Sequence, residues 1–151
     1  MLNKLLVFLK HLFLFIIGGA TYFGIEILYR GHSHYSMFIL GGVCFIIIGL
    51  MNEIWNWDAY IEKQIGVSLL IVLILEFIAG CILNIWLNLG IWDYSNQPLN
   101  IMGQVCIGFA LLWIPIILVA IILDDYIRYK VFKEEKPRYV SYIVNKIKKV
   151  F

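Results

Sequence analysis

Hydrophobic residues dominate four long stretches of this chain, and short polar segments separate them. The stretches cover about 11–29, 36–51, 65–92 and 101–123, and the second is the shortest. A helix needs about 20 mostly apolar residues to cross a bilayer. Because lipid cannot satisfy exposed backbone groups, such continuous stretches indicate helices. We therefore predict an all-α, polytopic membrane helix bundle with about four transmembrane helices.

The composition agrees with this interpretation. Hydrophobic residues make up 62% of the 151 residues, and the mean hydropathy is +0.88. A soluble domain is normally about 45–50% apolar. A water-soluble domain of this length has too little interior to bury the excess. The length fits one domain, with the bilayer as its solvent.

The N-terminal stretch could also be a secretory signal peptide, with Lys4 as its basic region and Gly18-Gly19-Ala20 as a small-residue cleavage site. However, Lys10 interrupts the run, and the apolar stretch continues past Ala20. We therefore expect this segment to remain as the first transmembrane helix.

The positions of Lys and Arg predict the orientation. Lys4 and Lys10 precede the first stretch, Lys63 lies between the second and third, and eight of the twelve basic residues lie in 124–151. The other two connections hold only Arg30. Basic residues concentrate on the cytoplasmic side of membrane proteins. We expect a multi-pass protein of the cell membrane with both termini in the cytosol.

The C-terminal tail divides from the helical part near residue 128. We interpret residues 1–128 as a transmembrane four-helix domain and 129–151 as a basic cytosolic tail. After Pro137, apolar residues recur at helical spacing while lysines lie largely off that face. This pattern is typical of an amphipathic helix on the membrane surface; a solvated, disordered tail is the alternative. No basic face precedes the tail, so we expect no nucleic-acid partner.

Two acids interrupt the apolar stretches. An ionised acid at the centre of a membrane helix costs about 2.5–3.5 kcal/mol on insertion scales. Glu26 has a partner in Arg30, four residues later, near the helix end. Glu76 has no basic residue in its own stretch, and Gly80, Asn84 and Asn88 follow it at steps of four. Such a stripe should face other helices rather than lipid.

Similar polar stripes occur in two other stretches. Gly18, Tyr22, Glu26 and Arg30 share this spacing in the first, as do Asn100, Gln104 and Gly108 in the fourth. Together the stripes predict an outward-opening polar cavity, although close helix packing alone would also use the glycines. The residues expected to line the cavity or bind a ligand are Glu26, Arg30, His34, Glu76, Asn84, Asp93, Asn100 and Gln104.

Other chemistry has weaker support in the sequence. The cysteines Cys44, Cys81 and Cys106 lie inside apolar runs without metal-ligand spacing, so we expect no metal and no cofactor. His32, His34 and Asp93 form only a sparse set of candidate metal ligands. A hydrolase using Ser36 or Ser95 with His34 and Asp93 is conceivable, but these residues have no recognised spacing.

Longer motifs in both halves of the chain resemble one known family, the CmpB-like membrane proteins. The resemblance covers about residues 15–128. It is carried by the runs Gly18-Gly19-Ala20-Thr21-Tyr22-Phe23-Gly24-Ile25-Glu26, Arg30-Gly31-His32-Ser33-His34-Tyr35-Ser36-Met37, Gly41-Gly42, Trp92-Asp93-Tyr94-Ser95, Pro98, Asn100 and Gly103-Gln104. The family is named for ABC-transporter permeases, so the resemblance implies a multi-span protein and, less directly, transport. It implies no substrate and no catalytic residue.

A transporter of this kind needs an ATPase that the chain does not supply. The sequence contains no GxxxxGK[ST] loop, so we expect any ATPase to be a separate subunit. Four short spans are also few for a complete permeation path, so we expect another membrane subunit or a homo-oligomer. Membrane lipids are further expected partners. The alternatives are a non-catalytic scaffold or regulatory subunit, in which the polar groups serve packing, and a membrane enzyme at the outer headgroup level.

Overall fold

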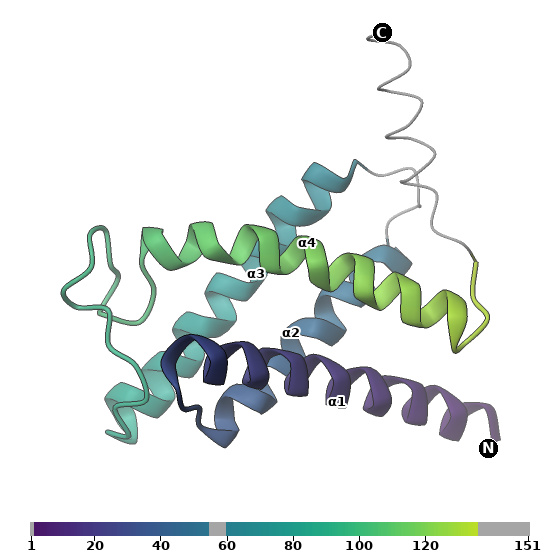
Figure 1. Cartoon of the computed structure of the whole chain (residues 1–151), viewed down its shortest axis with the longest axis horizontal. Coiled ribbons are helices and arrows are strands. Elements are labelled where there is room, and N and C mark those ends of the chain that lie inside the picture. The colour runs from purple at the N-terminus through teal and green to yellow at the C-terminus, as the bar shows by residue number, and fades with distance from the viewer. Residues whose placement is uncertain (1, 55–59, 136–151) are drawn as a thin grey trace, which may run out of the picture.

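The computed structural model describes residues 2–54 and 60–135, and this part of the chain forms α-helices and one π-helical segment without a β-strand (Figure 1). The elements are α1 (Leu2–Arg30), α2 (Tyr35–Ile54), α3 (Ile61–Gly80), η1 (Cys81–Trp86) and α4 (Ile107–Lys130). The η1 segment continues α3 directly. The predicted all-α class is confirmed.

Within residues 2–54 and 60–135, three helical segments are long and apolar enough to cross a membrane, namely Asn3–Arg30, Ile61–Trp86 and Ile107–Lys130. The apolar part of α2, Tyr35–Met51, is shorter. At about 1.5 Å per residue, α3 with η1 extends about 39 Å, which exceeds the ~30 Å hydrocarbon thickness of a bilayer. The chain is therefore a membrane protein, and the shorter apolar segment Tyr35–Met51 corresponds to the shortest predicted stretch.

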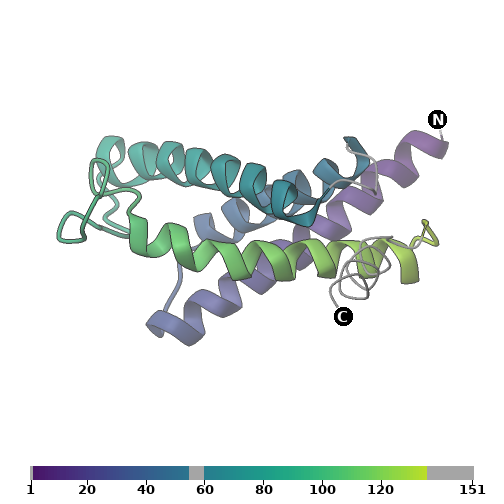
Figure 2. The same ribbon diagram turned by 90° about the horizontal axis from the view of Figure 1, so that it is seen from above.

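Successive helices run in opposite directions. Residues 31–34 and 87–106 lie at one end of the bundle, while the N-terminus and the last turns of α2 and α4 lie at the other (Figure 2). We call the first the loop end and the second the terminal end. Arg30 is thus at the loop end, and Lys10 and Arg128 lie toward the terminal end.

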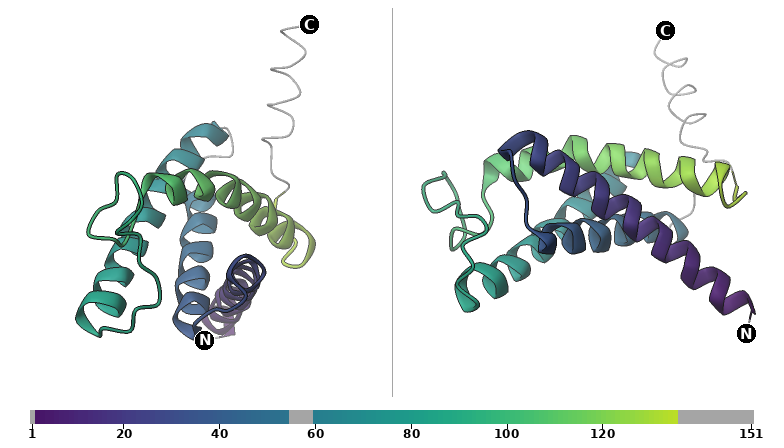
Figure 3. Two further views of the ribbon diagram at one scale, coloured as in Figure 1. Left: turned by 60° about the vertical axis from the view of Figure 1, so that its left-hand side comes forward. Right: turned by 60° about the horizontal axis from the view of Figure 1, so that its bottom comes forward.

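α2 occupies the centre of the bundle, between α1 and α3, and α4 packs against both α2 and α3 (Figure 3). α1 and α2 form the most extensive pair. Glycines permit their close approach: a Cβ on Gly19 would lie 2.5 Å from the carbonyl oxygen of Phe38, and one on Gly41 would lie 2.5 Å from the Cβ of Tyr22.

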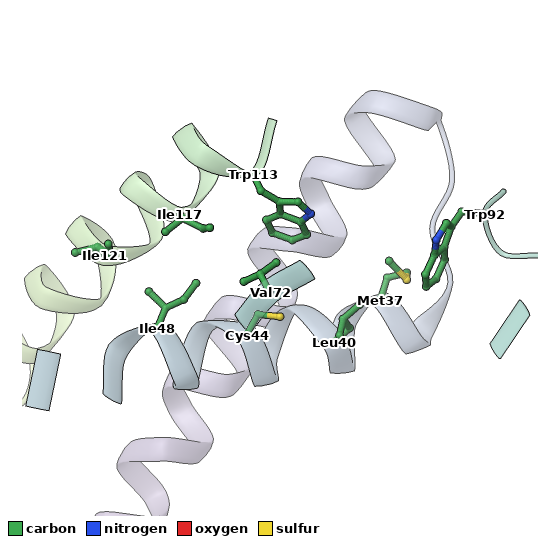
Figure 4. Packing of buried hydrophobic residues seen from close by; sticks show 9 residues of the cluster. All are labelled: Met37, Leu40, Cys44, Ile48, Val72, Trp92, Trp113, Ile117 and Ile121. Carbon is green, nitrogen blue, oxygen red and sulfur yellow. The ribbon is translucent and has the colours of Figure 1, made fainter. Parts of the chain in front are cut away.

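The apolar core lies where α2, α3 and α4 meet. Trp113, Ile117 and Ile121 of α4 face Cys44 and Ile48 of α2 (Figure 4). The full cluster of buried side chains is Met37, Leu40, Cys44, Ile48, Val72, Trp92, Trp113, Ile117 and Ile121. Outside this core, many large apolar side chains remain exposed, as expected for helices that face lipid.

The fourth helix is displaced from its predicted position. It begins at Ile107 rather than at 101 and continues to Lys130 rather than ending at 123. Leu99, Met102 and Gly103 adopt positive φ angles of 52°, 52° and 70°, which no α-helix contains. The prediction that Asn100 and Gln104 lie on this helix is therefore wrong, because both belong to the preceding loop.

The other predicted bounds also shift. α1 begins at Leu2 rather than at 11, since the segment before Lys10 is itself mostly apolar. The third helix ends at Trp86 rather than at 92, and Asn88 has a φ of 54°, so Asn88 does not continue the predicted stripe. α4 runs through the predicted domain boundary at 128. The amphipathic helix predicted after Pro137 falls outside the described residues.

Candidate functional site

A cavity of about 290 Å³ opens near the loop end, between α1, α3, α4 and the loop 87–106. Glu26 and Arg30 of α1, Glu76 of α3, Trp113 of α4 and Tyr94 of the loop contribute to its lining. Glu26 and Glu76 are 50 residues apart in the sequence, so the fold brings together the two acids that interrupt the apolar stretches.

The polar wall of the cavity is built at the end of α1. Arg30 forms an ion pair with Glu26 one helical turn earlier, and the Ser33 hydroxyl donates to the other Glu26 oxygen. Ser33 can reach back because Gly31 adopts a φ of 78° and ends the helix, with its N–H donating to the carbonyl of Ile27. Glycine is suited to this turn because it lacks a Cβ.

Arg30 also connects α1 to the long loop. Its Nη1 donates to the carbonyl of Ile91 at 3.3 Å. Its Nε is buried and has no hydrogen-bond partner in the described part of the chain. A guanidinium presents five donors in a fixed planar arrangement. Arg30 therefore holds the carboxylate of Glu26 and the loop, while one buried donor, its Nε, has no partner among the described residues.

Glu76 lies deeper, in the middle of the bundle, with only 3% of its surface exposed. The indole Nε1 of Trp113 donates to its Oε2 at 3.1 Å. The ring of Tyr22 stacks on Trp113, with centroids 5.2 Å apart and planes 5° from parallel. α1, α3 and α4 thus meet at this point through one acid and two aromatic rings.

The Glu76 side of α3 faces the interior, as predicted for its polar stripe. Ser68, Val72 and Glu76 are all buried on this face. Gly80 continues it, and a Cβ on Gly80 would lie 2.5 Å from the Gln104 side-chain oxygen. The face therefore packs against α2, α4 and the loop rather than against lipid.

Asn84 and Gln104 hold the loop onto the end of α3. The Asn84 side chain accepts the N–H of Ile91 at 2.7 Å and donates to Gln104 Oε1 at 2.9 Å. Gln104 Nε2 donates to the carbonyl of Met102, and the Gln104 carbonyl accepts the Trp92 indole N–H, both at 3.0 Å. Their amides are therefore engaged within the protein.

Asn100 and Asp93 organise the loop itself. Asn100 accepts the Gly103 N–H at 3.0 Å and donates to the carbonyls of Ser95 and Gln97. Asp93 accepts the Ser95 amide at 2.8 Å and its hydroxyl, and these two hydrogen bonds lower the pKa of Asp93. These bonds are local and shape the turn.

His34 stabilises the start of α2. Its Nδ1 lies 2.8 Å from the Ser36 hydroxyl and 3.3 Å from the Ser36 amide. Such a contact satisfies a backbone N–H at a helix start. Of the eight predicted site residues, Glu26, Arg30 and Glu76 line the cavity, whereas the remaining five form the loop and helix-end contacts around it.

A second polar cluster lies toward the terminal end, and the sequence analysis missed it. Arg128 is 2% exposed; its Nε donates to Asp124 at 2.6 Å, and its Nη1 pairs with Glu53 of α2. Lys10 of α1 lies 3.3 Å from the same Glu53 oxygen and also pairs with Glu134. These pairs join α1, α2 and α4. Only the Asp124–Arg128 spacing was visible in the sequence, because the other partners are far away along the chain.

The charges of this cluster act on Glu53, which lies beyond the apolar part of α2. Partial burial raises the pKa of the Glu53 carboxyl, but Arg128 and Lys10 outweigh this effect and hold it below its ordinary value of 4.5. Glu53 is therefore ionised at neutral pH, and its ion pairs with Lys10 and Arg128 link α2 to α1 and α4 near the terminal end.

No group of three or more His, Cys, Asp or Glu side chains is arranged to hold a metal ion within residues 2–54 and 60–135. Cys44, Cys81 and Cys106 are free thiols. The charged and aromatic groups that line the cavity are the carboxylates of Glu26 and Glu76, the Arg30 guanidinium and the rings of Tyr22, Tyr29, Tyr94, Phe109 and Trp113.

Comparison with known protein families gives a match over nearly the whole chain. A family model described as "Putative ABC-transporter type IV", the CmpB model, matches residues 8–150. No curated protein matches the sequence, and no solved structure matches the fold.

Proposed function

Because this chain belongs to the CmpB family of ABC-transporter-type proteins, we propose that it is the permease-like membrane subunit of a transporter whose ATPase is a separate subunit. The observation that supports this most is the cavity in which Glu26 and Arg30 meet Glu76 across two helices. Ionisable residues buried in membrane helices are costly, and they are found along substrate and ion pathways.

The geometry supports a site that faces one side of the membrane at a time. The cavity lies near the loop end, while the Arg128 cluster joins α1, α2 and α4 toward the terminal end. A polar substrate would enter beside Arg30 and reach Glu76. Passage to the other side would require the ion pairs of Arg128 to separate, which is costly unless an ATPase or the substrate favours the separated state.

The orientation follows from the charges. The terminal end carries Lys4, Lys10, Lys63, Arg128 and Lys130, whereas the loop end carries Arg30. We place the terminal end in the cytosol and the loop end outside the cell membrane, with both chain termini inside. The cavity then faces the exterior, and the cytosolic ends of the helices are available to an ATPase.

The partners follow from what the chain lacks. Its 151 residues contain no GxxxxGK[ST] loop, so ATP hydrolysis requires another subunit. A bundle with three long helices is small for a complete pathway, so a second copy or another membrane subunit would complete it. Lipids cover the exposed apolar faces, and nucleic acid has no part in this function.

Purification of the tagged chain in mild detergent after cross-linking in membranes tests the proposal. We expect an ATP-binding subunit to co-purify and the complex to hydrolyse ATP. Glu76→Gln should leave the complex assembled and lower its substrate-stimulated hydrolysis, whereas the exposed Glu135→Gln should not.

Two results would favour other functions. A stable complex without any ATP-binding subunit, unaffected by Glu76→Gln, would indicate the scaffold. Turnover of a lipid by the purified chain alone would indicate an enzyme. In either case the permease proposal would fail.

A further inference from the structure

A second cavity adjoins the polar one. It has a volume of about 230 Å³ and lies between α1, α2 and α4. Ile48, Val119 and Leu123 are among the residues that line it, and its walls are almost entirely apolar. The two cavities share Tyr22, Ile25, Trp113, Pro115 and Ile116. They therefore adjoin at the stacked rings of Tyr22 and Trp113, and we call the two cavities together the cleft.

The cleft has the length of a lipid chain. Its lining on α4 extends from Phe109 to Leu123. Fourteen residue steps of about 1.5 Å give about 21 Å. One leaflet contributes about 15 Å of hydrocarbon, half of the bilayer core, so the cleft can hold a head and much of a single chain. Val119 on its wall is 59% exposed, so the apolar part opens toward lipid.

The two parts of the cleft differ sharply in chemistry. Glu26 and Arg30 neutralise each other at the polar end. Glu76 receives the N–H of Trp113, and no Lys, Arg or His of the described residues forms an ion pair with it. The polar end therefore has an acid without a cationic partner among the described residues, and its lining also includes Arg30, whose buried Nε has no hydrogen-bond acceptor there.

Aromatic rings surround this acid. Tyr22 and Trp113 stack on one another, and Tyr94 and Phe109 stack with centroids 4.3 Å apart. All four residues line the polar cavity. A positively charged ammonium is attracted both to a carboxylate and to the faces of aromatic rings. Arg30 can in turn donate to an anionic phosphate.

We infer that the cleft binds a single-chain amphiphile whose head carries an ammonium group beside a phosphate. The ammonium lies at Glu76 among the aromatic rings, the phosphate accepts from Arg30, and the chain occupies the apolar cavity as far as Leu123. This names the substrate class of the site and rests on the proposed function only for the statement that the amphiphile is transported.

Native mass spectrometry of the detergent-solubilised full chain tests the inference with two lipids. Lysophosphatidylethanolamine has one chain, a phosphate and an ammonium; lysophosphatidylglycerol with the same chain lacks the ammonium. We expect one bound molecule per chain and at least about tenfold tighter binding of the first lipid, since a close buried charge pair contributes that much or more.

Three variants locate the two parts of the ligand. Val119→Trp fills the apolar cavity and should weaken binding of both lipids by about tenfold, the loss expected when a fitted chain is displaced. Leu111→Trp is its control, because Leu111 is equally exposed at 58% on the same helix and lines neither cavity. Glu76→Gln should retain binding and abolish the preference for the ammonium lipid.

The outcomes separate this inference from the proposed function. Equal binding of the two lipids by the unmodified protein, or equal binding by Val119→Trp and Leu111→Trp, would overturn it. These two comparisons decide the matter even if Glu76→Gln does not fold. No ATP or partner is present, so a chain that binds as expected but recruits no ATPase would retain this site while the transport proposal fails.

Discussion

Glu76 is the residue whose burial is hardest to reconcile with a role in packing alone. Trp113 satisfies only one of its two carboxylate oxygens, Oε2, at 3.1 Å. A leucine at this position would fill the same space without the cost of burying a carboxyl group. The single Trp113 bond nevertheless makes part of the role of Glu76 structural, and that part can be measured without knowing the ligand.

We expect Glu76→Gln to be at least as stable as the unmodified protein, because the amide oxygen can still accept the Trp113 N–H. Glu76→Ala should be less stable, since an unpaired buried N–H costs about 1–3 kcal/mol and the void adds to it. Thermal unfolding in detergent measures both. In a Trp113→Phe background the difference between Ala and Gln should shrink. If Gln is as damaging as Ala, the carboxylate is held as an ion by a cation.

Arg128 should be among the most sensitive residues of the chain. Removing one partner of a buried ion pair leaves an uncompensated charge and costs about 3–5 kcal/mol. Arg128→Met therefore leaves the buried Asp124 carboxylate without its cationic partner. Adding Asp124→Asn should restore part of the lost stability. Lys130→Met, exposed on the same helix, is the control. Denaturation in mixed micelles compares them, and equal stability of the two Met variants would contradict the buried pair.

The lowered pKa of Glu53 predicts a pH dependence of stability. A carboxyl with a depressed folded-state pKa stabilises the fold above its unfolded pKa and loses that contribution as pH falls through the folded value. Thermal stability of the unmodified protein should therefore exceed that of Glu53→Gln at neutral pH, and the gap should close as the pH falls below the ordinary value of 4.5. Glu135→Gln serves as the reference. A gap that stays constant down to strong acid would argue against this ion pair.

At the scale of the elements, the pairing of α1 with α2 depends on glycine. An added Cβ on Gly19 would collide with the carbonyl of Phe38, which is backbone and cannot move aside, whereas a Cβ on Gly24 would meet nothing within 4 Å. Gly19→Ala should therefore cost about 1–3 kcal/mol through overpacking. Gly24→Ala on the same helix should be neutral or stabilising by up to about 1 kcal/mol. Thermal unfolding of the pair in detergent gives the comparison, and similar melting temperatures would contradict the close packing.

The elements also show where sequence patterns hold and where they fail. The helices could be predicted because long apolar stretches allow no other structure in lipid. Asn100 and Gln104 were assigned to a helix because their spacing of four is helical, but that spacing has no meaning once Leu99 and Met102 adopt positive φ angles. Glu26 and Arg30 were paired correctly, since both lie on one helix.

Contacts between elements escape such patterns. Arg128 pairs with Glu53, which is 75 residues away in the sequence, and no periodic pattern relates the two positions. For the same reason, Trp113 was not recognised as the donor to Glu76, although its indole N–H required a partner once buried. The polarity of the site and the position of Tyr22 were therefore visible in the sequence, whereas Trp113 and Phe109 were not predicted to line it.

For the molecule as a whole, the two ends have different roles. Toward the terminal end, Arg128 and Lys10 join three helices through ion pairs. Near the loop end, the long loop is held to η1 by Asn84 and to α1 by Arg30, and the loop residue Tyr94 lines the polar cavity. The polar cavity therefore lies nearer the loop end, so its exposure to one side of the membrane depends on the orientation of the bundle.

Single-cysteine labelling tests that orientation. With Cys44, Cys81 and Cys106 replaced, His32→Cys and Asn96→Cys should react with a membrane-impermeant maleimide in intact cells, because both exposed positions are at the loop end. Glu62→Cys and Glu135→Cys should react only after the membrane is opened, if the basic terminal end lies in the cytosol as proposed. The cysteine-free protein is the blank. Labelling of Asn96→Cys and Glu135→Cys from the same side would contradict a bundle in which α4 crosses the membrane, and a complete reversal would place the cavity on the cytosolic side.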